Sequence, residues 1–134
     1  MVVTMALKVE LKPGERILIG NVVLRNGDNR ARFFIEGSCP ILREKDILTE
    51  GDADTAAKKI YFTVQLMYIA NDMSKYQKPY IDLITQFTQA APSSLAIIAD
   101  INNLILTDQM YKALKLAKKL IEYEAELMAH AQRG

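Results

Sequence analysis

The sequence contains few of the residues from which enzyme active sites and metal centres are usually built. Its 134 residues include one cysteine, Cys39, and one histidine, His130, so no intrachain disulfide can form. His130 lies close to the C-terminus, which argues against a histidine-based catalytic triad. Neither a glycine-rich phosphate loop nor the His and Cys spacing of a metal site is present. We therefore expect a protein that is not an enzyme and that uses no cofactor or metal.

An excess of charge of one sign is also missing, as are long apolar runs. The 17 Lys and Arg residues are balanced by 16 Asp and Glu residues, so any nucleic-acid site must be a local patch. No stretch approaches 18 consecutive apolar residues, and the first residues carry no basic segment. These features predict neither a membrane span nor a signal peptide. The single cysteine fits a reducing, cytoplasmic location.

The first third of the chain alternates between apolar and polar residues, which indicates short, half-buried strands. The first strand runs over 7–11 and ends at the turn residues Pro13 and Gly14. Further strands are predicted over 16–19, 22–24, 30–36 and 41–43, with Asn26-Gly27 as a hairpin signal. The shared phase of the apolar positions predicts one buried set, which comprises Leu7, Val9, Leu11, Ile17, Ile19, Ala31, Phe33 and Ile35.

The remainder of the chain has a helical period of 3.6 residues. Strands followed by helices predict an α+β fold, with a small antiparallel sheet of about five strands in 1–50 and a bundle of about four helices in 51–134. The last helix carries two apolar rows, which could cover neighbouring helices on one flank and another subunit on the other. Together with exposed strand edges, these rows predict a homo-oligomer, most simply with two-fold symmetry. The four helices are expected to begin near residue 53 with Asp52 or Asp54 as the cap, near Pro79 after a polar joint over 74–78, at Ser93 or Ser94 after Pro92, and after Thr107 as a cap.

Basic residues occupy alternate positions in the predicted strands, with Phe34 in phase with Arg30 and Arg32. Alternate residues of a strand share one face, where basic side chains can meet phosphates and arginine can pair with or stack on exposed bases. The same pattern also protects a strand edge against aggregation, and composition alone does not decide between these two interpretations. The candidate RNA-binding residues are Lys8, Lys12, Arg16, Arg30, Arg32, Arg43 and Lys45.

A second group of lysines lies on the last predicted helix, at Lys112, Lys115, Lys118 and Lys119. Lysines at this spacing usually form a solvated helix face, supported by weak pairs such as Lys118 with Glu122. A phosphate-contacting surface is the alternative.

The ordered motifs of the whole chain resemble the flagellum biosynthesis repressor FlbT family of alphaproteobacteria. The resemblance is carried by LKVELKPGERILIG from Leu7, RNGD from Arg25, LREKDILTE from Leu42 and IYFTVQLMY from Ile60. It implies post-transcriptional control of flagellin expression through the 5′ untranslated region of flagellin mRNA, whose translation and stability such proteins lower. It also implies a FlaF-type partner protein.

The strand region alone is also weakly similar to the carbon storage regulator (CsrA) family of small dimeric RNA-binding proteins. That resemblance implies contacts from Val9, Leu11 and Lys12 on the first strand. The chain departs from that family at Leu11-Lys12, where two arginines are expected, and at Glu44, where a contacting arginine is expected.

Two functional hypotheses follow. The first is an RNA-binding regulator whose sheet face contacts the message and whose helices mediate assembly or recruit a partner. The second is a protein-interaction module that acts through flagellin or the FlaF-type partner without binding RNA directly.

Overall fold

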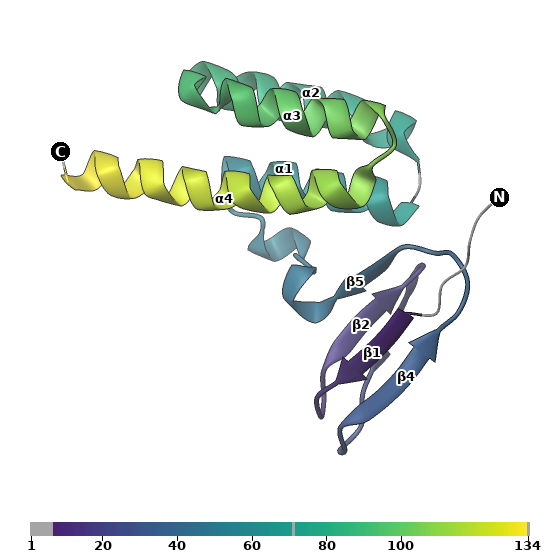
Figure 1. The fold of residues 1–134 in the computed structure, drawn as a ribbon. Helices are drawn as coiled ribbons and strands as arrows, with labels where there is room; N and C mark the ends of the chain where they lie inside the picture. Colours follow the sequence, from purple (N-terminus) through teal and green to yellow (C-terminus); the bar gives the residue numbers. More distant parts are fainter. Residues whose placement is uncertain (1–6, 71, 134) are drawn as a thin grey trace. The chain divides into compact units, whose positions relative to one another are not determined.

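Five short strands build the N-terminal part of the molecule, and four helices build the C-terminal part (Figure 1). We describe residues 7–70 and 72–133 of a computed structural model, except for the side chain of Arg133. The chain divides into two units, residues 1–47 and residues 48–134. This arrangement confirms the predicted α+β fold class.

The strands form two small antiparallel sheets. In the first sheet, β1 (Leu7–Leu11) pairs with β4 (Ala31–Ile35). In the second, β2 (Arg16–Ile19) lies between β3 (Val22–Arg25) and β5 (Ile41–Arg43). A short 3-10 turn over Glu44–Asp46 follows β5.

The core of the strand unit comes from the alternating apolar positions, as the sequence predicts. Val9, Leu11 and Ile17 are fully or almost fully buried. The half-buried side chains of Ile19, Phe33, Ile35 and Ile41 pack against them. Lys8 and Glu10 are exposed, which confirms the predicted orientation of β1.

Leu7 is the exception to the predicted buried set, because it lies in the terminal pair of the β1–β4 ladder, opposite Ile35, and is exposed. Ala31, at the other end of that ladder, is half-buried. Leu18 and Leu42 are buried although the alternation did not select them. They occupy paired positions in β2 and β5, on the face of that sheet opposite Ile17.

The hairpin predicted at Asn26-Gly27 is wrong, because β3 and β4 belong to different sheets. The Asn26 side chain instead binds the end of β1. Its amide nitrogen donates to the carbonyl oxygens of Leu11, Lys12 and Asn29 at 2.9–3.1 Å. The Asn26 side chain thus links the end of β1 to the segment between β3 and β4.

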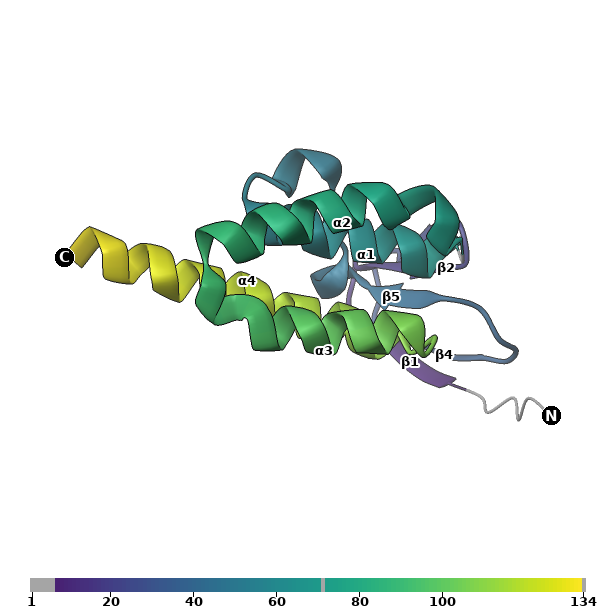
Figure 2. The same ribbon diagram turned by 90° about the horizontal axis from the view of Figure 1, so that it is seen from above.

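The helical unit consists of α1 (Ala56–Ala70), α2 (Met73–Ala90), α3 (Leu95–Leu106) and α4 (Met110–Arg133). Helix α1 packs against α2 and α4, and α4 packs against α3. Figure 2 shows the C-terminal end of α4 extending beyond the other helices. Short 3-10 turns over Glu50–Asp52 and Pro92–Ser94 precede α1 and α3. No helix in the described ranges is long and apolar enough to span a membrane.

Both apolar rows of α4 supply buried residues to this unit. Leu114 and Ala117 belong to one row and Ala113 and Leu120 to the other, and all four are buried. Much of each row is therefore covered by helices of the same chain.

The cap of α1 is Thr55 rather than Asp52 or Asp54. The hydroxyl of Thr55 accepts a hydrogen bond from the Lys58 backbone N–H at 3.2 Å. Asp54 instead forms an ion pair with the Lys58 ammonium at 3.2 Å. A second cap comes from α4, because the Glu124 carboxylate accepts from the Ala57 N–H at 2.9 Å. This cap joins positions far apart in sequence.

The predicted starts of the second and fourth helices are also wrong. Helix α2 begins at Met73, because the Asp72 carboxylate accepts hydrogen bonds from the N–H and hydroxyl of Ser74. The segment over 74–78 is therefore helical, and Pro79 lies inside the helix. Pro79 has no backbone N–H to donate to the Lys75 carbonyl, so α2 lacks that one hydrogen bond.

Thr107 ends α3 instead of starting α4. Its backbone N–H and its hydroxyl both donate to the Asn103 carbonyl, at 3.0 and 2.8 Å. Asp108 follows in the left-handed conformation, with φ of 58°. Aspartate tolerates the left-handed conformation better than most residues. A residue in this conformation commonly terminates a helix.

Candidate nucleic-acid interface

The outer face of the β1–β4 sheet displays basic and aromatic side chains. Lys8 lies opposite Phe34, and Glu10 lies opposite Arg32. The Phe34 ring is 61% exposed. Glu10 Oε1 lies 3.2 Å from Arg32 Nε and 3.7 Å from Lys8 Nζ. Because Glu10 offsets part of the charge of both cations, this face combines an exposed aromatic ring with partly neutralised basic groups.

A hollow of about 410 Å³ at the end of this face brings together four of the seven predicted residues. We call it the basic hollow. Its charged lining consists of Lys12, Arg30, Arg43, Lys45, Glu10 and Glu15. Four cations face two carboxylates, so the hollow carries an excess of positive charge in a chain that is nearly neutral overall. A phosphate group is the natural ligand of such a surface.

Arg16 does not line the basic hollow. Its Nε atom lies 3.1 Å from Glu44 Oε1, and its backbone N–H donates to Glu44 Oε2 at 3.3 Å. These hydrogen bonds, the side-chain one first, lower the pKa of the Glu44 carboxyl, and the nearby charge of Arg25 adds to the effect. Arg25 lies opposite Arg16 in the ladder between β2 and β3. Arg25 was not among the predicted residues, because it stands directly before Asn26-Gly27 and is the only basic residue of β3.

The lysines of α4 are distributed as on an ordinary surface helix. Lys112 and Lys119 are exposed. The Lys115 ammonium lies 5.2 Å from the centre of the Tyr111 ring, which itself packs 5.9 Å from the Tyr68 ring. These contacts favour the solvated-face interpretation of this group.

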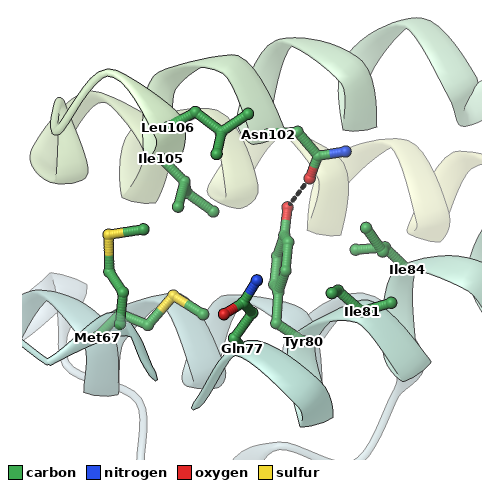
Figure 3. Close-up of a pocket in the computed structure, with 9 residues that line it drawn as sticks. Met67, Gln77, Tyr80, Ile81, Ile84, Asn102, Ile105 and Leu106 are labelled. Carbon is green, nitrogen blue, oxygen red and sulfur yellow. Dashed lines mark hydrogen bonds between the residues drawn. The ribbon is translucent and has the colours of Figure 1, made fainter. Parts of the chain in front are cut away.

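A second hollow, in the helical unit, is apolar and was not predicted from the sequence. It has a volume of about 270 Å³ and lies among residues of α1, α2 and α3. Figure 3 shows Tyr80 of α2 reaching across it to Asn102 of α3, where the Tyr80 hydroxyl donates to Asn102 Oδ1 at 2.5 Å. Burial raises the pKa of Tyr80. The remaining lining is Met67, Met73, Gln77, Ile81, Ile84, Ile105 and Leu106.

Over the part of the chain that the structure describes, no group of His, Cys, Asp and Glu residues is arranged to hold a metal ion. Cys39 is exposed. The two hollows stand out in this part of the chain, one basic and one apolar.

Comparison with known proteins identifies the family. The family model described as "Flagellar protein FlbT" matches residues 7–128. The chain belongs to the FlbT family. A protein of Bradyrhizobium diazoefficiens named "Probable flagellum biosynthesis repressor protein FlbT 1" is 54% identical over 124 residues, which cover 92% of this chain and 85% of that protein. No solved structure matches this chain.

More distant FlbT proteins match over similar lengths. The probable flagellum biosynthesis repressor FlbT of Rhodopseudomonas palustris strain TIE-1 is 48% identical, covering 93% of this chain and 99% of that protein. The flagellum biosynthesis repressor FlbT of Caulobacter vibrioides strain CB 15 is 35% identical, covering 97% and 94%. Family membership supports a regulator of flagellum synthesis, and the names denote repressors rather than enzymes.

Proposed function

We propose that this FlbT protein regulates flagellin expression by binding RNA in the 5′ untranslated region of flagellin mRNA. The observation that carries the proposal is the basic hollow, where Lys12, Arg30, Arg43 and Lys45 gather beside only two carboxylates. Such a protein acts where the message is translated, in the cytoplasm. Lower translation and stability of flagellin mRNA are the expected results.

The two parts of the surface would make different contacts. In the basic hollow, lysine and arginine would neutralise phosphates and release counterions. On the neighbouring outer face, the exposed ring of Phe34 would stack on an unpaired base. Arg32 and Lys8 interact with Glu10 and flank this ring, where they would hold the RNA strand beside it.

The decisive experiment is titration of fluorescent flagellin leader RNA over a series of salt concentrations. Loss of two phosphate contacts in Lys12→Ala/Lys45→Ala should reduce the slope of log K against log salt by about 1.4, or about 0.7 per contact. Phe34→Ala should instead weaken binding by about 1–3 kcal/mol and leave the slope unchanged. The two variants thus separate electrostatic contacts from stacking.

The matched control is Lys112→Ala/Lys119→Ala, which removes the same charge from exposed positions of α4. If this control weakens binding and the folded Lys12→Ala/Lys45→Ala variant does not, RNA binds elsewhere. If the wild type binds the leader no better than an unrelated RNA, the proposal fails and the protein-interaction hypothesis, with flagellin or a FlaF-type protein as partner, takes its place.

A further inference from the structure

One flank of α3 carries apolar side chains that the rest of the chain leaves exposed. Leu95 is 58% exposed and Leu106 is 79% exposed. They stand at the two ends of a row with Ala99 and Asn102, which we call the α3 seam. Asp100 is the only charged residue of α3. A solvent-facing helix usually carries several charges, so this flank is typical of a contact surface.

The spacing of the α3 seam is that of a helix–helix contact. Its members, Leu95, Ala99, Asn102 and Leu106, are separated by four, three and four residues. This alternation is that of the a and d positions of a coiled coil. A neighbouring row of α3, with Ile98, Ile101 and Ile105, is already buried within the unit, so the seam is a second, separate row.

The same row is symmetrical when it is read backwards. An antiparallel copy would place Leu95 opposite Leu106 of the other chain and Ala99 opposite Asn102, and then repeat both pairs. A surface that matches itself after a two-fold rotation is the requirement for an isologous dimer. The absence of charge from the seam removes like-charge repulsion between two copies. We therefore propose that the α3 seam is the contact surface of a two-fold homodimer of this protein.

The apolar hollow between α1, α2 and α3, described above, supplies a place for one side chain from each partner. Asn102 and Leu106 of the seam also line that pocket, together with Ile81 of α2, which is 47% exposed. Figure 3 shows Leu106 and Asn102 on α3 across from Tyr80 and Ile81 on α2. In the antiparallel arrangement, Leu95 of the second copy lies beside Leu106 and enters this pocket as a knob. Asn102, fixed by Tyr80, supplies a polar group that sets the register.

The dimer should be weak and concentration-dependent. A helix with the length of α3 spans about 18 Å. A contact made by one such helix therefore buries less area than the roughly 800 Å² per partner of a standard interface. We expect a dissociation constant of roughly micromolar order. The association is independent of RNA binding by the strand unit.

Sedimentation equilibrium of the full-length chain tests this contact. Leu95→Glu and Leu106→Lys, each alone, should raise the dissociation constant by roughly a hundredfold, because each would enclose an unpaired charge. An equimolar mixture of the two variants should associate again, because the antiparallel register pairs the new Glu of one chain with the new Lys of the other. Recovery in the mixture is specific to this register.

Met128→Lys is the matched control, because it adds a charge at an exposed apolar position of α4, and it should leave the dissociation constant unchanged. Far-UV circular dichroism verifies that each variant folds. A wild type that stays monomeric at all concentrations overturns the proposal. So does a dimer that tolerates both single variants, or a mixture that fails to associate.

Discussion

Gln65 holds the start of the helical unit against α1 through both atoms of its side-chain amide. Its Nε2 donates to the Leu48 carbonyl and its Oε1 accepts from the Leu48 N–H, both at 2.9 Å. The side chain is buried, with 4% of the residue exposed. Gln65 therefore bonds to Leu48 much as a neighbouring strand would, and its removal leaves two backbone groups without a partner.

We predict that Gln65→Leu destabilises the helical unit by about 2 kcal/mol, from two hydrogen bonds at about 1 kcal/mol each. For a domain of 60–100 residues, 1 kcal/mol corresponds to about 4–8 °C in Tm, so Tm should fall by roughly 8–16 °C. Thermal unfolding monitored by far-UV circular dichroism measures this, because the helices dominate that signal. Gln86→Leu, at an exposed position of α2, is the control and should change stability by less than about 0.5 kcal/mol.

Gln65→Glu gives the same prediction a pH signature. An ionised Glu would place negative charge against the Leu48 carbonyl, whereas a protonated Glu can still donate to it. The folded-state pKa of the new Glu should therefore be raised above its ordinary value of about 4.3. Stability relative to wild type would be greatest below that ordinary pKa and would be lost as pH rises through the folded-state pKa. Equal Tm values for Gln65→Leu and Gln86→Leu would refute the role assigned to this side chain. So would a loss of stability in Gln65→Glu that does not change with pH.

Three further predictions concern other contacts. Glu10→Gln frees Arg32 and Lys8 and should tighten binding of leader RNA at low salt roughly two- to fivefold; unchanged or weaker binding in the titration would contradict this. In an ultraviolet pH titration, Tyr80 should ionise well above the ordinary pKa of about 10 because it is buried, and Tyr80→Phe should remove this late ionisation. Because the raised pKa favours neutral Tyr80, its contribution to stability is present below pH 10 and is lost as pH rises further; a Tyr80→Phe variant that loses no late-ionising signal would contradict the assignment. Glu124→Ala should cost about 1 kcal/mol in thermal unfolding through loss of the α1 cap, whereas Glu126→Ala, at an exposed position, should cost little.

Patterns that depend on near neighbours in the sequence predicted much of the fold. Alternation in β1 and β4 selected Val9, Leu11 and Phe33 for the interior, because the period of two is a property of the strand itself. The helical period likewise identified four helices and the two rows of α4. The order of strands and helices then gave the fold class.

Some of the errors lie where a distant side chain contributes to the local structure, whereas the starts of α2 and α4 depend on contacts within four residues. Asn26 marks a hairpin in isolation, but it donates to the end of β1 instead. The start of α1 depends on Glu124, whose distance along the chain hides the cap from any local pattern. Local helix propensity therefore cannot predict helix boundaries that tertiary contacts set.

The candidate interface shows the same division. Alternation placed the basic residues on a strand face, but the pairing of strands determined their partners. Register puts Glu10 opposite Arg32, and the end of β5 carries Glu44 to Arg16. These pairings separate the basic hollow from residues whose charge is already offset, and no sequence spacing contains that information.

The cap that Glu124 provides also has a consequence for the order in which the chain is synthesised. The Ala57 N–H at the first turn of α1 receives this acceptor from a residue 67 positions later. During translation, α1 therefore remains incompletely capped until most of α4 has been made. A product that stops before Glu124 lacks this cap, so its helical unit should be less stable than that of the full-length chain by about 1 kcal/mol.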